Sequence, residues 1–330
     1  MEDFDKEYEE YKKHTWIIGD IHGMYDPLRT LVNHLDNDNL NKFVFVGDYI
    51  DHGPSSKEVL DLIMSLGDKA VTLLGNHEHL LLDTLFNEKH IDEWGTRIWM
   101  ENGADSTMRS FGYNKFEDFK ANIDEKYTDF MKNMKCFHQE EYDNGLFGAK
   151  ITVVHGGIMP NVPFEEQLKI NDYADMTKFI DDRKIWIENV PTWIRRDFLN
   201  GDPDHWNGHI IIHGHTPTPS LDYYMDELSE KSSTDEDEDE DEEEAEKIDL
   251  NSYYLRRHPK NNLIASIDID TGAAFGNKLT AIGLSASGFN FYGGLTVQVA
   301  EVNIKKGYRK TPLKFSSFEI NDVRDYGHKV

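Results

Sequence analysis

The sequence predicts an α/β fold, and three observations point to it. Short apolar runs rich in β-branched and aromatic residues recur along the chain, beginning with Thr15–Ile18. Segments with the apolar spacing of helices separate the first three of these runs. Most runs end in polar or glycine-rich motifs, the first of which is Gly19-Asp20-Ile21-His22-Gly23. Alternating strands and helices are typical of α/β proteins, which place their functional sites at the carboxyl ends of the strands.

The predicted strands are apolar runs of about four residues that are bounded by turn signals. Those that precede a polar motif are Thr15–Ile18, Phe43–Val46, Ala70–Leu74, Ile151–Val154 and Ile210–Ile212. Later runs predict the strands of a second, largely antiparallel sheet, at Leu263–Ile269, Leu279–Leu284, Phe289–Tyr292 and Leu295–Val302.

Two segments between the early strands space their apolar residues at i, i+3, i+4 and i+7, or nearly so, and therefore predict amphipathic helices that pack on a sheet. The apolar positions are Leu28, Leu31, Val32 and Leu35, followed by Val59, Leu60, Ile63 and Leu66. From about residue 90 to 144 the chain is polar and aromatic and lacks strand-ending motifs, so we expect a helical insertion that flanks the site.

We expect one domain over residues 15–330, preceded by a charged segment at residues 1–14. The formal net charge of −27 makes broad electrostatic binding of nucleic acid or of an anionic membrane unfavourable. Asp235–Glu244 is an unbroken run of acids. Such a run repels itself and buries nothing, so it predicts a disordered acidic loop over about residues 226–247, available to contact a basic partner.

The chain shows no apolar stretch long enough to cross a bilayer, and Met1 to Lys13 are too charged for a secretory signal. Its single cysteine, Cys136, cannot form an intrachain disulfide, which favours a reducing compartment. A cytoplasmic location is therefore expected. Cys136 itself is interpreted as an ordinary packed or surface thiol rather than as a nucleophile.

Six side chains with oxygen or nitrogen donors stand just beyond apolar strands: Asp20, His22, Asp48, Asn76, His155 and His215. Carboxylate, amide and imidazole groups suit hard and borderline divalent ions, including Mn, Fe and Zn. Six ligands are too many for one ion but suit a pair that shares one carboxylate. Paired ions can clamp both the attacking and the leaving oxygen of a phosphoryl displacement. The sequence therefore predicts a binuclear phosphoesterase centre.

The strand-ending motifs, taken together, resemble the signature blocks of the PPP-type Ser/Thr phosphatases, which are calcineurin-like metallophosphoesterases. The blocks are Gly19-Asp20-Ile21-His22-Gly23, Gly47-Asp48-Tyr49-Ile50-Asp51-His52-Gly53, Gly75-Asn76-His77-Glu78, His155-Gly156-Gly157 and Gly214-His215-Thr216, with Asp270-Thr271-Gly272 closing the set. They follow the family's order, and the short-loop bacterial and phage members match best. The resemblance implies an αββα sandwich, in which two packed mixed β-sheets are flanked by helices.

The resemblance also implies roles for individual residues. Asp20 and His22 would bind the first metal, and Asp48 would bridge both. Asn76, His155 and His215 would complete the second metal, with His215 preferred over His213 because it occupies the Gly-His-Thr position. His77 would be the general acid, and Asp51 would orient its ring.

Two positions depart from the family pattern. His52 and Leu74 stand where many members carry arginines that grip phosphate, and neither is an equal replacement. Arg195 is the remaining candidate for phosphate binding, with Arg196 as its neighbouring alternative and His52 as a weaker contributor.

The leading functional hypothesis is a phosphomonoesterase, specifically a Ser/Thr protein phosphatase, that uses a metal-bridging hydroxide for direct attack on a phosphoprotein or a small phosphorylated substrate. Two divalent ions are the expected cofactors, with Mn expected in vitro and Fe or Zn as alternatives. The alternative enzyme hydrolyses dinucleoside polyphosphates or other nucleotide phosphoanhydrides. Enzymes of that type resemble this chain but typically carry Gln at the position of His22 and Asp at that of Glu78. A pseudophosphatase that only binds a partner is the non-catalytic alternative.

Overall fold

The computed structural model describes residues 14–36, 41–87, 93–143, 148–225, 250–285, 295–304 and 313–320. The charged segment expected at 1–14 falls, except for its last residue, outside this part of the chain. The same holds for the acidic loop expected at 226–247 and for the strand expected at Phe289–Tyr292.

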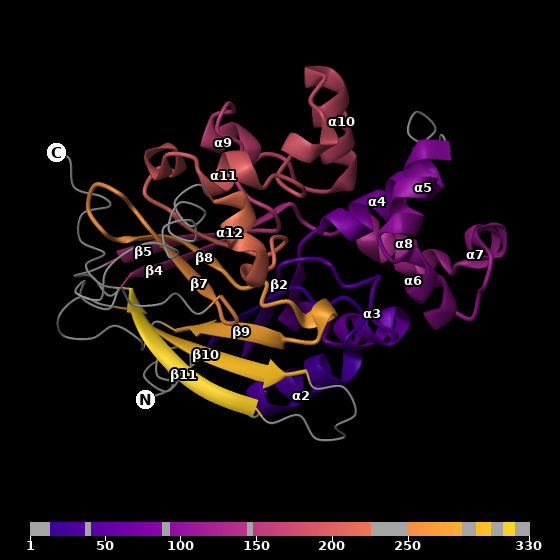
Figure 1. Cartoon of the computed structure of the whole chain (residues 1–330), viewed down its shortest axis with the longest axis horizontal. Coiled ribbons are helices and arrows are strands. Elements are labelled where there is room, and N and C mark those ends of the chain that lie inside the picture. Colours follow the sequence, from indigo (N-terminus) through magenta and orange to yellow (C-terminus); the bar gives the residue numbers. More distant parts are fainter. Residues whose placement is uncertain are drawn as a thin grey trace, which may run out of the picture.

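Two mixed sheets form the centre of the fold, as the family resemblance implies (Figure 1). The six-stranded sheet has the order β11 (Leu313–Ile320), β10 (Leu295–Asn303), β9 (Lys278–Leu284), β1 (Thr15–Ile18), β2 (Lys42–Phe45) and β3 (Ala70–Thr72). Strands β1, β2 and β3 are parallel, whereas β9, β10 and β11 run antiparallel to their neighbours.

The five-stranded sheet has the order β4 (Phe137–Asp143), β5 (Gly148–Val154), β6 (Ile210–His213), β8 (Ile264–Asp268) and β7 (Tyr254–Arg257). Its three central strands, β5, β6 and β8, are parallel. The edge strands β4 and β7 are antiparallel to their neighbours.

The two sheets pack face to face. One buried apolar cluster draws residues from both sheets, including Ile17 and Val44 from the first and Ile151, Ile212 and Ile267 from the second. Each is at most 1% exposed. Because these β-branched residues fill the space between the sheets, the carboxyl ends of β1, β2, β5 and β6 are held in fixed relative positions.

Helices cover the outer faces. The early helices are α2 (Tyr25–Leu35), α3 (Ser56–Ser65) and α4 (Asn76–Phe86), followed by α5 (Glu93–Glu101), α6 (Ala104–Ser110), α7 (Phe116–Asn122) and α8 (Glu125–Lys132). The later helices are α9 (Phe164–Gln167), α10 (Tyr173–Arg183), α11 (Arg196–Leu199) and α12 (Leu221–Tyr224). Short 3-10 turns are η1 (Gly67–Lys69), η2 (Ile187–Asn189), η3 (Pro203–Trp206), η4 (Thr218–Ser220) and η5 (Ala273–Phe275). None of the helices in the described part of the chain has the length and apolar character needed to span a bilayer.

The apolar spacing correctly predicted the buried faces of the first two helices. Leu28, Leu31, Val32 and Leu35 of α2 are all buried, as are Val59, Leu60 and Ile63 of α3. Leu66 lies just beyond α3 as its C-cap.

Two expectations about secondary structure were wrong. The segment from about 90 to 144 contains helices α5 to α8, but its last part is the strand β4. This strand lies at a sheet edge, where polar residues such as His138 and Glu140 are tolerated, so it lacks a strong apolar signal. The late strands also do not form a separate sheet, because β9, β10 and β11 extend the sheet of β1 while β8 joins β6.

Candidate metal centre

Five segments that are far apart in the sequence meet at one edge of the sandwich. Each follows the carboxyl end of one of the strands β1, β2, β3, β5 and β6. They carry the six side chains that the sequence predicts as metal ligands, and we call this set the candidate metal centre: Asp20, His22, Asp48, Asn76, His155 and His215. The segments after β1, β2 and β3 supply the first four residues, and those after β5 and β6 supply the last two. All six residues are buried.

Asp48 lies between the two halves of the candidate metal centre. Its Oδ2 atom is 3.4 Å from His22 Nε2, and its Oδ1 atom is 3.3 Å from His155 Nε2. Two groups of potential ligand atoms, each within 4.8 Å of one another, share this carboxylate: one adds Asp20 and His22, and the other adds His155 and His215. A shared carboxylate between two such groups is consistent with a binuclear site.

The three imidazoles are oriented by backbone carbonyls. A carbonyl oxygen can only accept, so the ring nitrogen that faces it carries the proton. The pairs are His22 Nδ1 with Ile50 O at 2.9 Å, His155 Nδ1 with Val46 O at 3.1 Å, and His215 Nε2 with Trp193 O at 2.9 Å. In neutral rings the other nitrogen of each then presents a lone pair to the centre, which is how metal-binding histidines are usually held.

Several hydrogen-bond acceptor atoms face one another in the centre, and cations between them would balance this arrangement. Asn76 Oδ1 lies 2.9 Å from His155 Nε2 and 2.8 Å from His215 Nδ1, although both ring protons are directed at backbone carbonyls. Burial, followed by the charge of Arg195, holds the pKa of His215 well below its usual range, so this ring is neutral. The buried Asp20 Oδ1 has no hydrogen-bond partner among the described residues. These residues therefore fit a pair of divalent ions.

Excess negative charge in the centre leads to the same conclusion. Burial, then the carboxylates of Asp270 and Asp48, raise the pKa of Asp20 well above its usual range. Burial is also the main reason that the pKa of Asp270 rises to about 6. Buried carboxylates this close together need either protons or metal cations to balance them.

The backbone around the centre adopts conformations that side chains rarely take. Positive φ angles occur at His22 (46°), Asp48 (54°), Asp51 (68°), His52 (60°) and His215 (70°). Such angles cost free energy and cluster at functional sites. The loops are also packed too tightly for larger residues, because a Cβ atom at Gly214 would collide with Asp20 Oδ1.

Glu78 supports the loop that carries Asp48. Its buried carboxylate accepts hydrogen bonds from the backbone N–H groups of Asp48, Tyr49 and Ile50, at 3.0, 2.8 and 3.2 Å. Burial and the nearby Asp48 charge raise the pKa of Glu78 to about 8. Its contacts are therefore those of a structural residue.

His77 and Asp51 form the pair that the resemblance implies. His77 Nδ1 lies 2.8 Å from Asp51 Oδ2, which leaves Nε2 on the side of Asp48, 3.9 Å from its Oδ2 atom. Burial alone would lower the pKa of His77. The carboxylates of Asp48 and Asp51 outweigh it and raise this pKa to about 9, so the ring can hold a proton near neutral pH.

Two residues that the sequence interpretation missed hold Asp51 in place. Trp99 Nε1 in α5 donates to Asp51 Oδ2 at 3.1 Å, and Thr107 Oγ1 in α6 donates to Asp51 Oδ1 at 2.6 Å. The backbone N–H of Asp51 also donates to Thr107 Oγ1 at 2.8 Å. Both helices belong to the segment predicted as a flanking insertion, and nothing in its polar and aromatic composition singled out these two residues.

The two arginines considered for phosphate binding have different surroundings. Arg195 Nη2 lies 3.3 Å from His215 O and 3.4 Å from His215 Nδ1. The buried Arg195 Nε lacks a hydrogen-bond partner within the part of the chain that the structure describes. Arg196 is exposed and donates to Tyr223 O at 2.9 Å. Arg195 is thus the arginine at the candidate metal centre.

The positions that depart from the family pattern also differ from each other. His52 is exposed, and its ring centroid is 4.9 Å from that of His22 and 5.1 Å from that of His77. Leu74 is fully buried in the core and has no access to substrate. His213 is buried behind the site against Phe198 and lies 3.9 Å from Asp268. Asp270, quoted only as part of a closing motif, belongs to the electrostatic environment of the centre.

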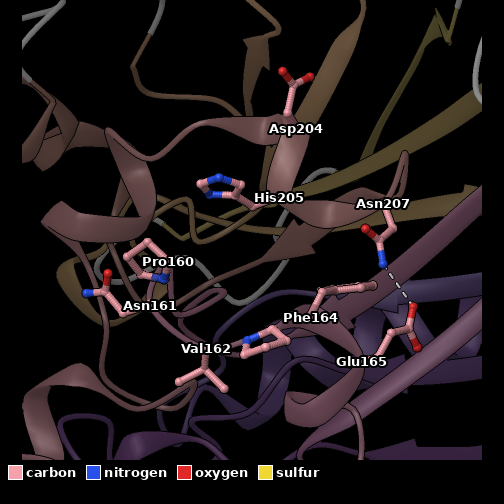
Figure 2. Close-up of a pocket in the computed structure, with 9 residues that line it drawn as sticks. Pro160, Asn161, Val162, Phe164, Glu165, Asp204, His205 and Asn207 are labelled. Atoms are coloured by element: carbon pink, nitrogen blue, oxygen red, sulfur yellow. Dashed lines mark hydrogen bonds between the residues drawn. The ribbon is translucent and has the colours of Figure 1, made fainter.

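A separate cavity of about 450 Å³ lies between the α9 region and η3 (Figure 2). Its lining includes Phe164, Glu165 and Asn207, and Asn207 Nδ2 donates to Glu165 Oε1 at 3.0 Å. None of the six residues of the candidate metal centre lines it. This cavity therefore is not part of the predicted site.

Comparison with known proteins identifies a family. A family model described as calcineurin-like phosphoesterase matches residues 13–255, well over half of the chain. The asymmetrical bis(5′-nucleosyl)-tetraphosphatase PrpE of Anoxybacillus flavithermus is 28% identical over 215 residues, which cover 61% of this chain and 78% of that protein. The symmetrical bis(5′-nucleosyl)-tetraphosphatase of Dechloromonas aromatica is 31% identical over 147 residues, 44% of each chain.

The matches to the symmetrical enzymes are partial, since the chain spans less than half of their length. Among solved structures, a protein serine/threonine phosphatase from Saccharomyces cerevisiae aligns with a TM-score of 0.46 and 12% identity, over 93% of this chain and 80% of that one.

Proposed function

The chain belongs to the calcineurin-like phosphoesterase family, and from this premise we propose that it hydrolyses dinucleoside polyphosphates, with bis(5′-nucleosyl) tetraphosphates as substrates. The observation that carries the proposal is the similarity to the asymmetrical tetraphosphatase of Anoxybacillus flavithermus, which extends over 61% of this chain. The proposal reverses the order of the sequence expectation, which ranked a Ser/Thr protein phosphatase first.

A protein Ser/Thr phosphatase remains the second candidate, and His22 is the observation that favours it. Dinucleoside polyphosphate hydrolases that resemble this chain typically carry Gln at that position. The other residue that favoured a phosphatase, Glu78, no longer supports that function. Its carboxylate accepts hydrogen bonds from three backbone N–H groups of the Asp48 loop. A residue with that role reports on loop structure rather than on the substrate.

In the proposed mechanism, Asp20, His22 and Asp48 would hold one divalent ion, and Asp48, Asn76, His155 and His215 would hold the other. When bound, such ions supply Lewis acidity toward phosphoryl oxygens and lower the pKa of a water ligand. Mn is the ion we propose for in vitro work, and Fe and Zn are alternatives with the same preference for these ligands.

The protein's own side chains perform the remaining steps. Arg195, whose Nη2 lies 3.3 Å from His215 O, binds phosphoryl oxygens from the side of His215. His77 donates its Nε2 proton to the departing phosphate oxygen. Asp51 keeps the imidazole oriented through the 2.8 Å contact at Nδ1, and Trp99 and Thr107 fix Asp51 in turn.

A substrate panel tests the proposal. The Mn-loaded protein is assayed with diadenosine tetraphosphate, a phosphoserine peptide and bis(p-nitrophenyl) phosphate, and kcat/KM is compared. We expect the highest value for the tetraphosphate. A higher value for the peptide would establish the second candidate instead, and no hydrolysis of any substrate would favour the non-catalytic pseudophosphatase.

A further inference from the structure

We propose that Phe275 is the stacking platform of a nucleobase subsite beside the candidate metal centre. This inference rests on the proposed function, because it assigns the residue that recognises the nucleoside part of the substrate. The ligand class is a purine or pyrimidine base joined to a phosphate chain.

The first observation is the exposure of the Phe275 ring next to the site. Its side chain is 73% exposed, and its ring centroid is 6.2 Å from that of His52 at an interplanar angle of 42°. The His52 ring in turn lies 4.9 Å from His22 and 5.1 Å from His77. Phe275 is therefore one ring beyond His22, a proposed metal ligand, and His77, the proposed acid.

The second observation is that the backbone presents this ring in a defined way. Phe275 is the last residue of the short 3-10 turn η5. The turn lies between two glycines with left-handed φ angles, Gly272 at 74° and Gly276 at 83°. Asn277 Nδ2 ties the loop down by donating to Thr271 O at 2.7 Å. A rigid platform loses little conformational entropy when a base stacks on it.

Location, rather than exposure alone, distinguishes Phe275. Single exposed apolar residues are common on protein surfaces and need no special explanation. In the part of the chain that the structure describes, the other large exposed hydrophobic side chains are Phe86 at the end of α4, Phe315 on the edge strand β11, Trp186 before η2, and Tyr223 of α12, whose ring contacts Tyr224 on the Arg195 side of the centre. Within the described residues, Phe275 is the large exposed hydrophobic side chain whose ring contacts His52.

The two sides of the candidate metal centre offer complementary chemistry. Arg195, a cation, contacts His215 on one side, and Phe275, an aromatic ring, contacts His52 on the other. A dinucleoside polyphosphate has both matching parts, a multiply charged phosphate chain and a flat base. The phosphate chain would extend from Arg195 across the centre, and one base would stack on Phe275. Every base has a π-face, so stacking would not depend strongly on which base is present.

Inhibition of the Mn-loaded full chain tests the subsite directly. ADP and inorganic phosphate both present a phosphate to the centre, but only ADP carries a base. With Phe275→Ala we expect the ratio of Ki for ADP to Ki for phosphate to rise by roughly 5- to 150-fold, the range that base stacking on an aromatic side chain supports. Phe275→Tyr keeps the π-face and should retain the wild-type ratio. Phe275→Leu keeps an apolar side chain but should behave like Phe275→Ala.

Phe315→Ala is the matched control, since it removes a phenylalanine that is 60% exposed on a strand three places from β1 in the sheet. This variant should keep the wild-type Ki ratio. An unchanged ratio in Phe275→Ala would overturn the subsite, as would a Phe275→Leu variant that matches wild type. An equal loss of activity toward a phosphoserine peptide and the tetraphosphate would also overturn it, because the ring would then make only a general apolar contact.

The same data separate failure of the subsite from failure of the proposed function. If wild type cleaves diadenosine tetraphosphate but the Ki ratio is the same in wild type and Phe275→Ala, the proposed function stands and the subsite is wrong. If wild type does not cleave the tetraphosphate but the Ki ratio changes as expected, the subsite stands and the proposed substrate is wrong.

Discussion

His77 is bound through Nδ1 to a single carboxylate, and its other ring nitrogen faces Asp48. This arrangement gives the proton a defined direction, from Nε2 toward the centre. The neighbouring residues Asn76 and His77 therefore have separable proposed roles, one in holding metal and the other in moving a proton. That separation is testable, because a change at His77 should leave the ligand set intact.

Replacement of His77 by Asn should reduce kcat by about 10²- to 10⁴-fold, the usual contribution of a general acid. Asn is close in size and keeps a polar group near Asp51, so bound metal should remain at the wild-type level. Steady-state kinetics and elemental analysis of the same sample give both quantities. Unchanged turnover would show that His77 is not the acid, and loss of metal would show that it supports the ligands instead.

His52→Arg is the second change at the residue scale. His52 lies at the exposed side of the centre, and an arginine there would add a planar cation that can grip two phosphoryl oxygens. We expect the Ki of inorganic phosphate to fall by about tenfold, which corresponds to ~1.4 kcal/mol. His52→Lys is the control for charge without the planar geometry. Equal effects of Arg and Lys would indicate simple charge attraction, and no effect of Arg would place the phosphate out of reach of this position.

At the residue scale, the motifs predicted which side chains gather at the centre better than they predicted the residues that support them. Each predicted ligand follows a strand, so its position is set by local sequence and by the common direction of parallel strands. The partners of Asp51 come from positions 48 and 56 residues further along the chain, on helices whose packing the sequence does not encode locally. Long-range hydrogen bonds of this kind leave no periodic signal.

The helices α5 and α6 connect the surface of the molecule to Asp51. They pack against α4 and α3, and Figure 1 shows them together with α7 and α8 at one end of the molecule. Trp99 and Thr107 are both fully buried in this packing. The helical segment thus has a structural connection to the proposed acid, beyond its predicted place beside the site.

Thr107→Val in α6 tests this connection. The change keeps the side-chain shape but removes the hydroxyl that donates to Asp51 and accepts from its backbone. We expect a stability loss of about 1–3 kcal/mol, because buried polar groups lose their partner, and a fall in kcat of about 10- to 100-fold as His77 loses its orientation. Denaturant unfolding and kinetics measure the two effects.

Thr128→Val in α8 provides the control. Thr128 is also buried in the helical segment, but its hydroxyl donates to Glu125 O rather than to a residue of the site. The Thr128→Val variant should be less stable than wild type. When Thr128→Val and Thr107→Val are both assayed under conditions in which they are fully folded, Thr128→Val should keep the wild-type kcat. Equal kcat values for the two variants would remove Thr107 from the network that orients His77.

At the element scale, the success of sequence prediction followed the strength of the apolar pattern. Helix α2 has one apolar stripe, and its buried face was predicted except for Pro27. The edge strand β4 alternates around polar residues and was taken for helix. Strands β7 and β11 also lie at sheet edges and were not predicted. Edge strands are paired on one side only, so they need fewer apolar residues.

For the whole molecule, the centre concentrates buried acids that protons or metal cations must balance. Removal of metal with a chelator should therefore lower the melting temperature. An ion present at about 100 times its Kd stabilises the folded state by ~2.7 kcal/mol, which amounts to several degrees for a protein of this size. Calorimetry over a range of Mn²⁺ concentrations measures the shift.

Asp48→Asn is the matching variant, because it weakens the carboxylate shared by both groups of ligands. Its melting temperature should respond less to Mn²⁺, and it should bind less metal. A melting temperature that is independent of Mn²⁺ in the wild type would contradict a centre built from these residues.

At this scale, the sequence did not predict which of the late strands belong to which sheet. The family resemblance carried by the motifs implied two mixed sheets, and the family match confirms that fold. The motifs did not predict that the late strands β9 to β11 continue the first sheet, because sheet membership depends on which edge remains open after β1, β2 and β3 have paired. That is a property of the packed chain and not of any segment.

Because the six potential donor residues follow strands of both sheets, neither sheet alone carries the whole proposed ligand set. His215 reaches back across 195 positions to Asp20, whose carboxylate accepts its backbone N–H at 2.9 Å. The ions would thus bind only after the two sheets have packed together, and they would then join the two layers. A change that shifts one layer against the other would therefore separate the donor atoms without altering any of the six residues.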